Sequence, residues 1–191
     1  MADERARGHI VMSNIDHQML LKRGDLGCVC DRRPNTPPDR FCVEFTQCEV
    51  ALLHSQYRYV HITATGRSTV TGLMKSSPAK VGLVVCSEID HRDVARGDMG
   101  FIVGVSNDLQ HLDRVLVDFG GGVQLNMTMD MIRSVQEYGC IGDTVYSTID
   151  HASVQIGDPG RVAAPSNDRK AKDRMNVAFG THPLNAFNLT K

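Results

Sequence analysis

The sequence contains three copies of one short motif, and this internal repeat constrains the fold more than any other feature. The shared frame reads G-x-x-V-x-S-x-I-D-H, then G-D-x-G, then D-R-x-x-V-x-F, with spacing that shifts by at most one residue between copies. The copies span residues 8–45, 82–119 and 142–179. Because self-similarity of this kind is typical of repeat architectures, we expect three copies of one structural unit.

Each copy is predicted to consist of short β-strands. In V-x-S-x-I and in x-x-V-x-F, alternate residues are β-formers that would share one face of an extended chain. Asp158-Pro159-Gly160 suits a type II turn, and we expect the same turn at G-D-x-G in every copy. A further strand is expected after each phenylalanine, over 50–53, 123–127 and 184–189. The predicted fold class is all-β.

The repeat divides the chain into four segments. Residues 1–54 form the first repeat unit, 81–134 the second and 135–191 the third. Residues 55–80 do not follow the frame, and we interpret them as an accessory hairpin or linker that packs with the first unit. Since a unit of this size buries little hydrophobic core alone, we expect the units to pack against one another or against a partner.

Two sequence stretches resemble a known class of small domain. The third copy opens with Gly142-Asp143-x-Val145, and the first contains K-x-G-x-x-G-x-V from Lys22 to Val29. These stretches resemble the KOW-type and Mib/HERC2-type SH3-like barrels, and the GDxGxV repeats found in tandem in protist proteins. The resemblance implies three tandem small SH3-like β-barrels with short polar loops. KOW-type domains often bind RNA or ribosomal and transcription proteins, and Mib/HERC2-type domains bind partner peptides, so it implies a non-catalytic binding or scaffold role.

The charge balance bears on the class of partner. With 21 Lys and Arg against 22 Asp and Glu, the chain lacks the basic excess that a protein needs when its main partner is bulk nucleic acid. An alternative hypothesis is a KOW-like protein that binds RNA or DNA through the basic loop of the third unit, Arg169, Lys170, Lys172 and Arg174. Without an apolar run of about 20 residues or a signal-like start, we expect no membrane insertion and an intracellular, soluble protein of the cytoplasm or an organelle.

The polar residues that recur in all copies are interpreted as structural. Adjacent residues of a strand point to opposite faces, so the Asp and His of one I-D-H triplet would not converge on a substrate. An enzyme that uses these Asp-His groups is kept as an alternative hypothesis. The residues assigned to the repeat structure are Asp16, His17, Gly24, Asp25, Gly27, Asp90, His91, Gly97, Asp98, Gly100, Asp150, His151, Gly157, Asp158 and Gly160.

Four cysteines of the first copy raise the question of zinc. Cys28, Cys30, Cys42 and Cys48 supply enough thiolates for a tetrahedral ion. The other copies have no cysteine at the places of the first three, however, and C-x-C is not the usual knuckle spacing. We therefore predict no metal site, no cofactor and no catalytic residue.

Aromatic content narrows the mode of binding. The chain has no Trp, four Tyr and six Phe, and the three phenylalanines of the repeat are expected in the core. Tyr57, Tyr59, Tyr138 and Tyr146 are then the exposed candidates, of which we select Tyr57 and Tyr59 as partner-binding residues together with the basic loop. The leading hypothesis is an adaptor or structural subunit of a larger assembly that contacts other proteins through barrel loops and edges.

Overall fold

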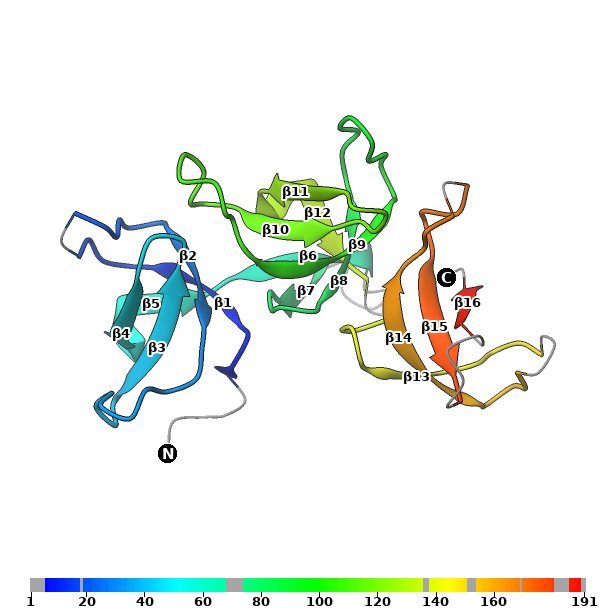
Figure 1. Cartoon of the computed structure of the whole chain (residues 1–191), viewed down its shortest axis with the longest axis horizontal. Helices are drawn as coiled ribbons and strands as arrows, with labels where there is room; N and C mark the ends of the chain where they lie inside the picture. The colour runs from blue at the N-terminus through cyan, green and yellow to red at the C-terminus, as the bar shows by residue number, and fades with distance from the viewer. Residues whose placement is uncertain are drawn as a thin grey trace.

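The computed structural model describes residues 6–17, 19–67, 74–135, 138–150, 154–168, 170–180 and 186–189. These residues form three β-sheets and short 3₁₀ turns, with no α-helix among them, so the all-β prediction is confirmed. Figure 1 shows the three units in a row, with the N-terminus in the first and the C-terminus in the third.

The first two units share one strand order. The first sheet runs β4-β3-β2-β1-β5, and the second repeats this order as β11-β10-β9-β8-β12 before adding β6 and β7 beside β12. A 3₁₀ turn precedes the last strand of each unit, η2 (His54–Gln56) before β5 and η3 (Met129–Met131) before β12. The strands of the first unit are β1 (Ile10–Ser13), β2 (Leu26–Val29), β3 (Arg40–Phe45), β4 (Glu49–Leu53) and β5 (Tyr57–Tyr59).

The second and third sheets differ in size. The second contains β6 (His61–Arg67), β7 (Met74–Pro78), β8 (Val84–Ser87), β9 (Met99–Val105), β10 (Val115–Asp118), β11 (Gln124–Met127) and β12 (Ile132–Ser134). The third contains β13 (Thr144–Tyr146), β14 (Pro159–Pro165), β15 (Met175–Phe179) and β16 (Ala186–Leu189), in that order across the sheet. All three sheets are open in the described chain, so strand pairing does not show the closed barrels expected from the sequence.

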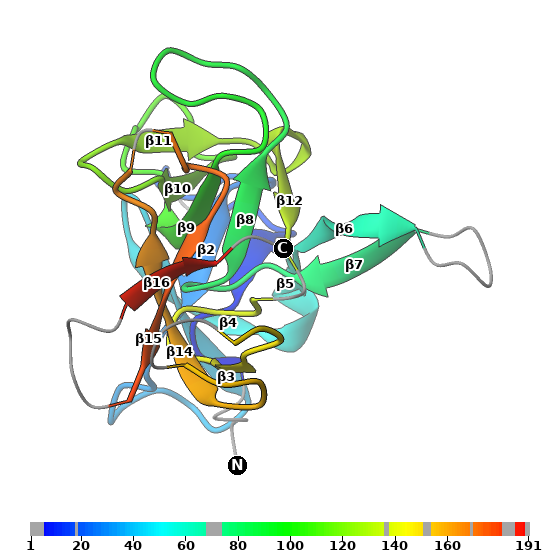
Figure 2. The ribbon, with the colours of Figure 1, turned by 90° about the vertical axis from the view of Figure 1, so that its right-hand side faces the viewer.

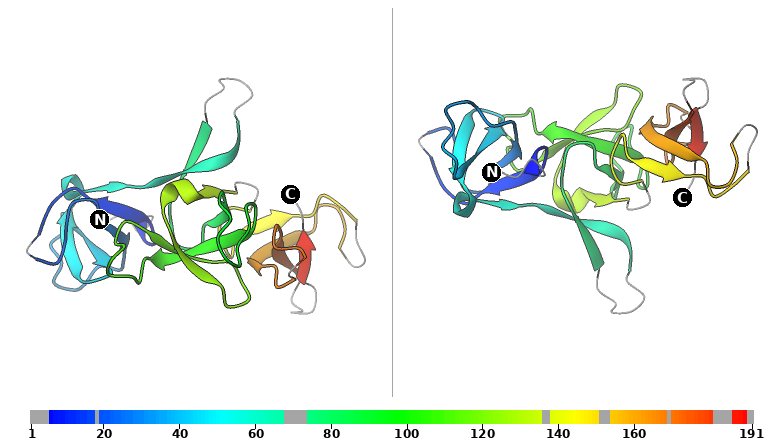
Figure 3. Two further views of the ribbon diagram at one scale, coloured as in Figure 1. Left: turned by 90° about the horizontal axis from the view of Figure 1, so that it is seen from above. Right: turned by 90° about the horizontal axis from the view of Figure 1, so that it is seen from below.

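Residues 55–80 are divided between two sheets. Strand β5 completes the first sheet by pairing with β1, whereas β6 and β7 form a hairpin that projects from the side of the row (Figures 2 and 3). Strand β6 pairs in parallel with β12, so the hairpin extends the second sheet, and the carbonyl of Ala79 after β7 accepts from the N–H of Ile10 in the first unit. The chain changes sheet at Val60, whose N–H donates to the carbonyl of Ile10. The return strand expected at 68–73 lies outside the described residues.

The G-D-x-G motif does not form the predicted type II turn. Its second glycine lies inside a strand with an ordinary φ, and the left-handed φ belongs instead to the first glycine. A Cβ on Gly100 would lie 2.6 Å from the carbonyl oxygen of Asp118 and 3.0 Å from Cδ1 of Phe119. The second glycine is therefore needed because the phenylalanine that ends the frame packs directly on the strand. The same approach occurs at Gly27 and Gly160.

This close approach predicts a position-specific effect of an added methyl group. We expect Gly100→Ala to lower the free energy of unfolding by about 1–3 kcal/mol, because the methyl group overpacks the site. Gly104→Ala in the same strand is the matched control, since nothing lies within 4 Å of its Cβ position. Urea unfolding of both variants is the measurement, and an equal loss of stability in the two would contradict the explanation.

Neighbouring units share their hydrophobic cores. Ile10 and Val11 are adjacent in β1 and both fully buried, but Val11 packs in the core of the first unit and Ile10 in that of the second. In β8, Val85 packs in the core of the second unit and Val84 in that of the third. Because successive side chains of a strand point to opposite faces, the first strand of a unit serves two cores.

One backbone hydrogen bond recurs at both junctions. The N–H of Leu26 donates to the carbonyl of Leu112 at 2.8 Å, and the N–H of Met99 donates to the carbonyl of Lys172 at 2.7 Å. The donors occupy the same place in G-D-x-G, and the acceptors both precede the Asp-Arg pair of the following unit. The two junctions are therefore built in the same way.

Shared cores predict that neighbouring substitutions destabilise different units. Ile10→Ala is expected to cost about 2–5 kcal/mol and to lower amide hydrogen-exchange protection first in β9 and β10 of the second unit. Val11→Ala should lower protection first in β2 and β3 of the first unit. Site-resolved hydrogen exchange separates the two results, and the same exchange pattern for both variants would refute the division of the cores.

Candidate functional site: the groove between the second and third units

The repeated aspartates are held by the backbone of their own loops. The carboxylate of each I-D-H triplet accepts a hydrogen bond of 2.9 Å from a backbone N–H on the far side of the loop. The carboxylate of each G-D pair accepts one of 2.7–2.8 Å from the backbone N–H three residues before it. The pairs are Asp16 with Arg23, Asp90 with Arg96, Asp150 with Ile156, Asp25 with Lys22, Asp98 with Ala95 and Asp158 with Gln155. These carboxylates stabilise the loop between the first two strands of each unit.

The histidines of the repeat are not gathered into a site. The side chains of His17 and His91 are exposed, and their backbones form short bridges with Leu21 and Val94. His151 lies outside the described residues. In the described part of the chain, no group of three or more His, Cys, Asp or Glu side chains is placed to hold a metal ion.

The cysteines of the first unit are free thiols. Burial raises the pKa of Cys28 to about 11, with a smaller effect of Glu44, and burial with Glu49 raises the pKa of Cys30 to about 11. Both groups are therefore protonated at neutral pH. Cys42 is buried, with its Sγ 3.0 Å from the hydroxyl of Thr36.

The raised pKa values predict slow alkylation of these thiols. Because the thiolate is the nucleophile, iodoacetamide should modify Cys28 and Cys30 slowly at neutral pH, with a rate that rises about tenfold per pH unit toward pH 11. The same chain in urea is the control, since unfolding restores an ordinary thiol pKa. Mass spectrometry of the modified peptides is the measurement, and fast modification of the folded chain at neutral pH would contradict the prediction.

The tyrosines selected as partner-binding residues are part of the first unit. Tyr57 is only 3 % exposed and makes edge-to-face contacts with the rings of Phe41, His54 and Tyr59. The expectation that Tyr57 is exposed is wrong, because pairing of β5 with β1 turns this ring into the core, and its burial raises the pKa of its hydroxyl. Tyr59 is half-buried. Of the other two tyrosines, Tyr138 is buried and Tyr146 is exposed.

The described residues of the basic loop in the third unit differ in their exposure and contacts. Lys170 is exposed, and Arg169 lies outside the described residues. The Nζ of Lys172 donates to the backbone carbonyl of Asp93 in the second unit at 2.6 Å. Arg174 is half-buried, with its Nε 3.9 Å from a carboxylate oxygen of Asp173. Lys172 thus joins two units, while Lys170 remains exposed.

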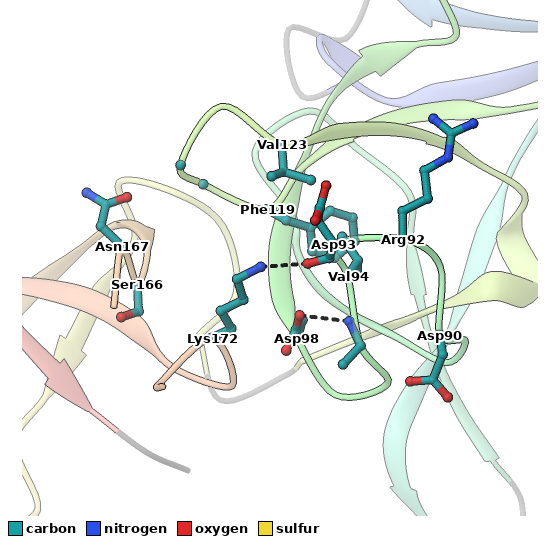
Figure 4. Close-up of a pocket in the computed structure, with 13 residues that line it drawn as sticks. Asp90, Arg92, Asp93, Val94, Asp98, Phe119, Val123, Ser166, Asn167 and Lys172 are labelled. Atoms are coloured by element: carbon teal, nitrogen blue, oxygen red, sulfur yellow. Dashed lines mark hydrogen bonds between the residues drawn. The ribbon is translucent and has the colours of Figure 1, made fainter. Parts of the chain in front are cut away.

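A cavity of about 690 Å³ lies where the second and third units meet (Figure 4). Its walls are the loop 90–98 and the turn 119–123 of the second unit, and the loop 166–172 of the third. Apolar side chains line part of it, including Phe119 and Val123, and three aspartates and two cations belong to the same lining. We call this cavity the junction groove.

Several residues that line the junction groove are replaced at the first junction. At the first junction the hydroxyl of Thr46 donates to the carbonyl of Ser106. Gly120 holds the place of Thr46 at the second junction, with a φ of 76°, and so removes that side chain. The groove is also lined by Arg92, which has a φ of 51° and is the one non-glycine residue with a left-handed φ among those described. Such backbone conformations concentrate at binding sites.

Comparison with protein-family models and with curated proteins gives no match to this chain. No helix in the described residues is long and apolar enough to cross a membrane. Sequence reasoning missed the junction groove, although Gly120-Gly121-Gly122 marks the copy in which it occurs. Locally that triplet has the pattern of a hairpin turn, and the neighbouring unit that forms the opposite wall is not visible in a local pattern.

Proposed function

We propose that the chain is a non-catalytic scaffold of three SH3-like units that binds a segment of a partner protein in the junction groove. The strand order of the first two units, with a 3₁₀ turn before the fifth strand, supports the SH3-like assignment. The proposal rests on one observation: the groove is lined by residues that are particular to this junction, among them Asp93, Gly120 and Lys172, beside repeated residues of the second unit.

The size and charge of the groove favour a basic peptide. About 690 Å³ lies within the range of roughly 300–1,000 Å³ typical of ligand sites. Asp90, Asp93 and Asp98 outnumber Arg92 and Lys172, so the rim attracts a basic side chain and repels a phosphate backbone. These charges favour a protein partner over nucleic acid.

Selection of peptides tests this proposal. Phage-displayed random peptides are selected on the immobilised 191-residue chain, and their Kd is measured by calorimetry. We expect enrichment of basic peptides whose binding is weakened about tenfold by Asp93→Lys, equivalent to about 1.4 kcal/mol. Met19→Lys is the matched control, because Met19 is exposed and holds the same place after the histidine of the first unit.

Two results would overturn the proposal. One is a set of selected peptides that bind the Asp93→Lys and Met19→Lys variants equally well. The other is salt-dependent RNA binding by the chain that is lost when Lys170 is changed to Glu, which would favour the nucleic-acid alternative.

A further inference from the structure

The first strand of the third unit has an open edge that is covered in the other two units. Strand β1 lies between β2 and β5, and β8 lies between β9 and β12. Within the described residues, β13 pairs with β14 alone and forms the edge of its sheet. The counterparts β4, β11 and β16, by contrast, are edge strands in all three units. The edge of β13 is therefore the one that departs from the repeat.

The backbone groups on this edge are known from their counterparts. In the first unit the N–H of Asn14 donates to Gln56 and the carbonyl of Ile10 accepts from Val60. In the second unit the equivalent bonds join Glu88 to Met131 and Val84 to Val135. The corresponding groups of the third unit are the N–H of Thr148 and the carbonyl of Thr144, on either side of Tyr146. Such a row of backbone groups is a template for pairing with another strand.

The side chains beside this edge also lack cover. Val11 and Val85 are fully buried, whereas their counterpart Val145 is only partly buried. Ile15 and Ile89 pack on the cores of their units as partly buried residues, whereas Ile149 is 50 % exposed. Apolar cover and backbone pairing are therefore incomplete on the same side of the third unit.

We propose that the open edge of β13 binds an extended strand of a partner protein, added antiparallel in the place that β5 and β12 occupy in the other units. Adding a strand to an exposed sheet edge is a common mode of peptide recognition, in which backbone hydrogen bonds give affinity and alternate side chains give specificity. This surface is separate from the junction groove and does not depend on it.

The internal fifth strands indicate the chemistry of the partner strand. They read Tyr57-Arg58-Tyr59 and Ile132-Arg133-Ser134, with the first and third side chains more buried than the exposed or half-buried arginine between them. On the third unit the arginine position would lie opposite Tyr146, which is 67 % exposed and suits a cation–π contact.

Charge points to the same kind of strand. The segment 143–150 that contains β13 carries Asp143 and Asp150 and no Lys or Arg. In the second unit the guanidinium of Arg133 lies 2.9 Å from the carboxylate of Glu88. The fifth strand of that unit therefore places a positive charge beside a negative charge of the first strand. A partner strand with an apolar, a basic and a small or aromatic residue in succession therefore fits the edge of β13.

The chain supplies its own probe for a direct test. A synthetic peptide with the sequence of residues 129–135, MDMIRSV, is titrated into the isotope-labelled 191-residue chain and followed by NMR. We expect chemical-shift changes at the amides of 144–148. Tyr146→Pro should weaken binding at least about tenfold, because proline removes the central N–H of the edge. Tyr146→Ala keeps that N–H and should change the Kd by less than about threefold.

Three outcomes would overturn the inference. They are the absence of shift changes at 144–148 in the unchanged chain, equal binding by the Tyr146→Pro variant, and a self-associated chain that Tyr146→Pro converts to monomer, which would make a second copy the occupant. Asp93→Lys is expected to leave peptide binding unchanged. Failure of the groove proposal and failure of this one therefore give different results.

Discussion

The first strand of each of the first two units is buried on both faces, and the joining of the units depends on this. An antiparallel sheet commonly has one apolar face and one solvated face, which produces an alternating sequence. Strands β1 and β8 instead carry buried apolar residues on both faces, with Val11 and Val85 in their own cores and Ile10 and Val84 in the next. Units of this size bury little surface alone, so sharing a strand face supplies core that each lacks.

The first strand of the third unit does not have apolar residues on both faces. Thr144 and Arg161, both exposed, take the places of Val84 and Phe101. Pro159 takes the place of Leu26 and Met99, whose N–H groups bond to the next unit, and proline has no N–H to donate. Terminal repeats with a polar outer face close an array. A further unit placed there would therefore meet neither an apolar face nor a backbone donor.

At the opposite end of the row, aromatic rings pack together in the first unit. Val115 and Met175 occupy equivalent places in the second and third units and are fully buried next to the preceding unit. Their counterpart in the first unit is Phe41, which is half-buried and packs on Tyr57 with the ring of His54 nearby. This contact explains why a tyrosine that composition marks as a binding candidate serves the core.

The parts of the fold that local patterns determine could be predicted, and those that depend on neighbouring units could not. Strands expected at 50–53 and 123–127 occur at Glu49–Leu53 and Gln124–Met127, because hydrophobic alternation specifies them. The division of Tyr57–Thr63 between two sheets could not be predicted, since the alternation continues on both sides of Val60 and no turn residue marks the change. Asp158-Pro159-Gly160 likewise has the sequence of a turn. Gly160 lies in a strand instead, because the ring of Phe179 packs against it, and this contact between distant residues is not visible in the local sequence.

Both proposed surfaces involve the third unit and lie where residues or strands depart from the repeat. Gly120 and Lys172 replace Thr46 and Leu112 at the second junction and accompany the groove, while the edge of β13 lacks the strand that covers its counterparts. Residues shared by all copies are used to build the units, so a difference between copies is free to serve a partner.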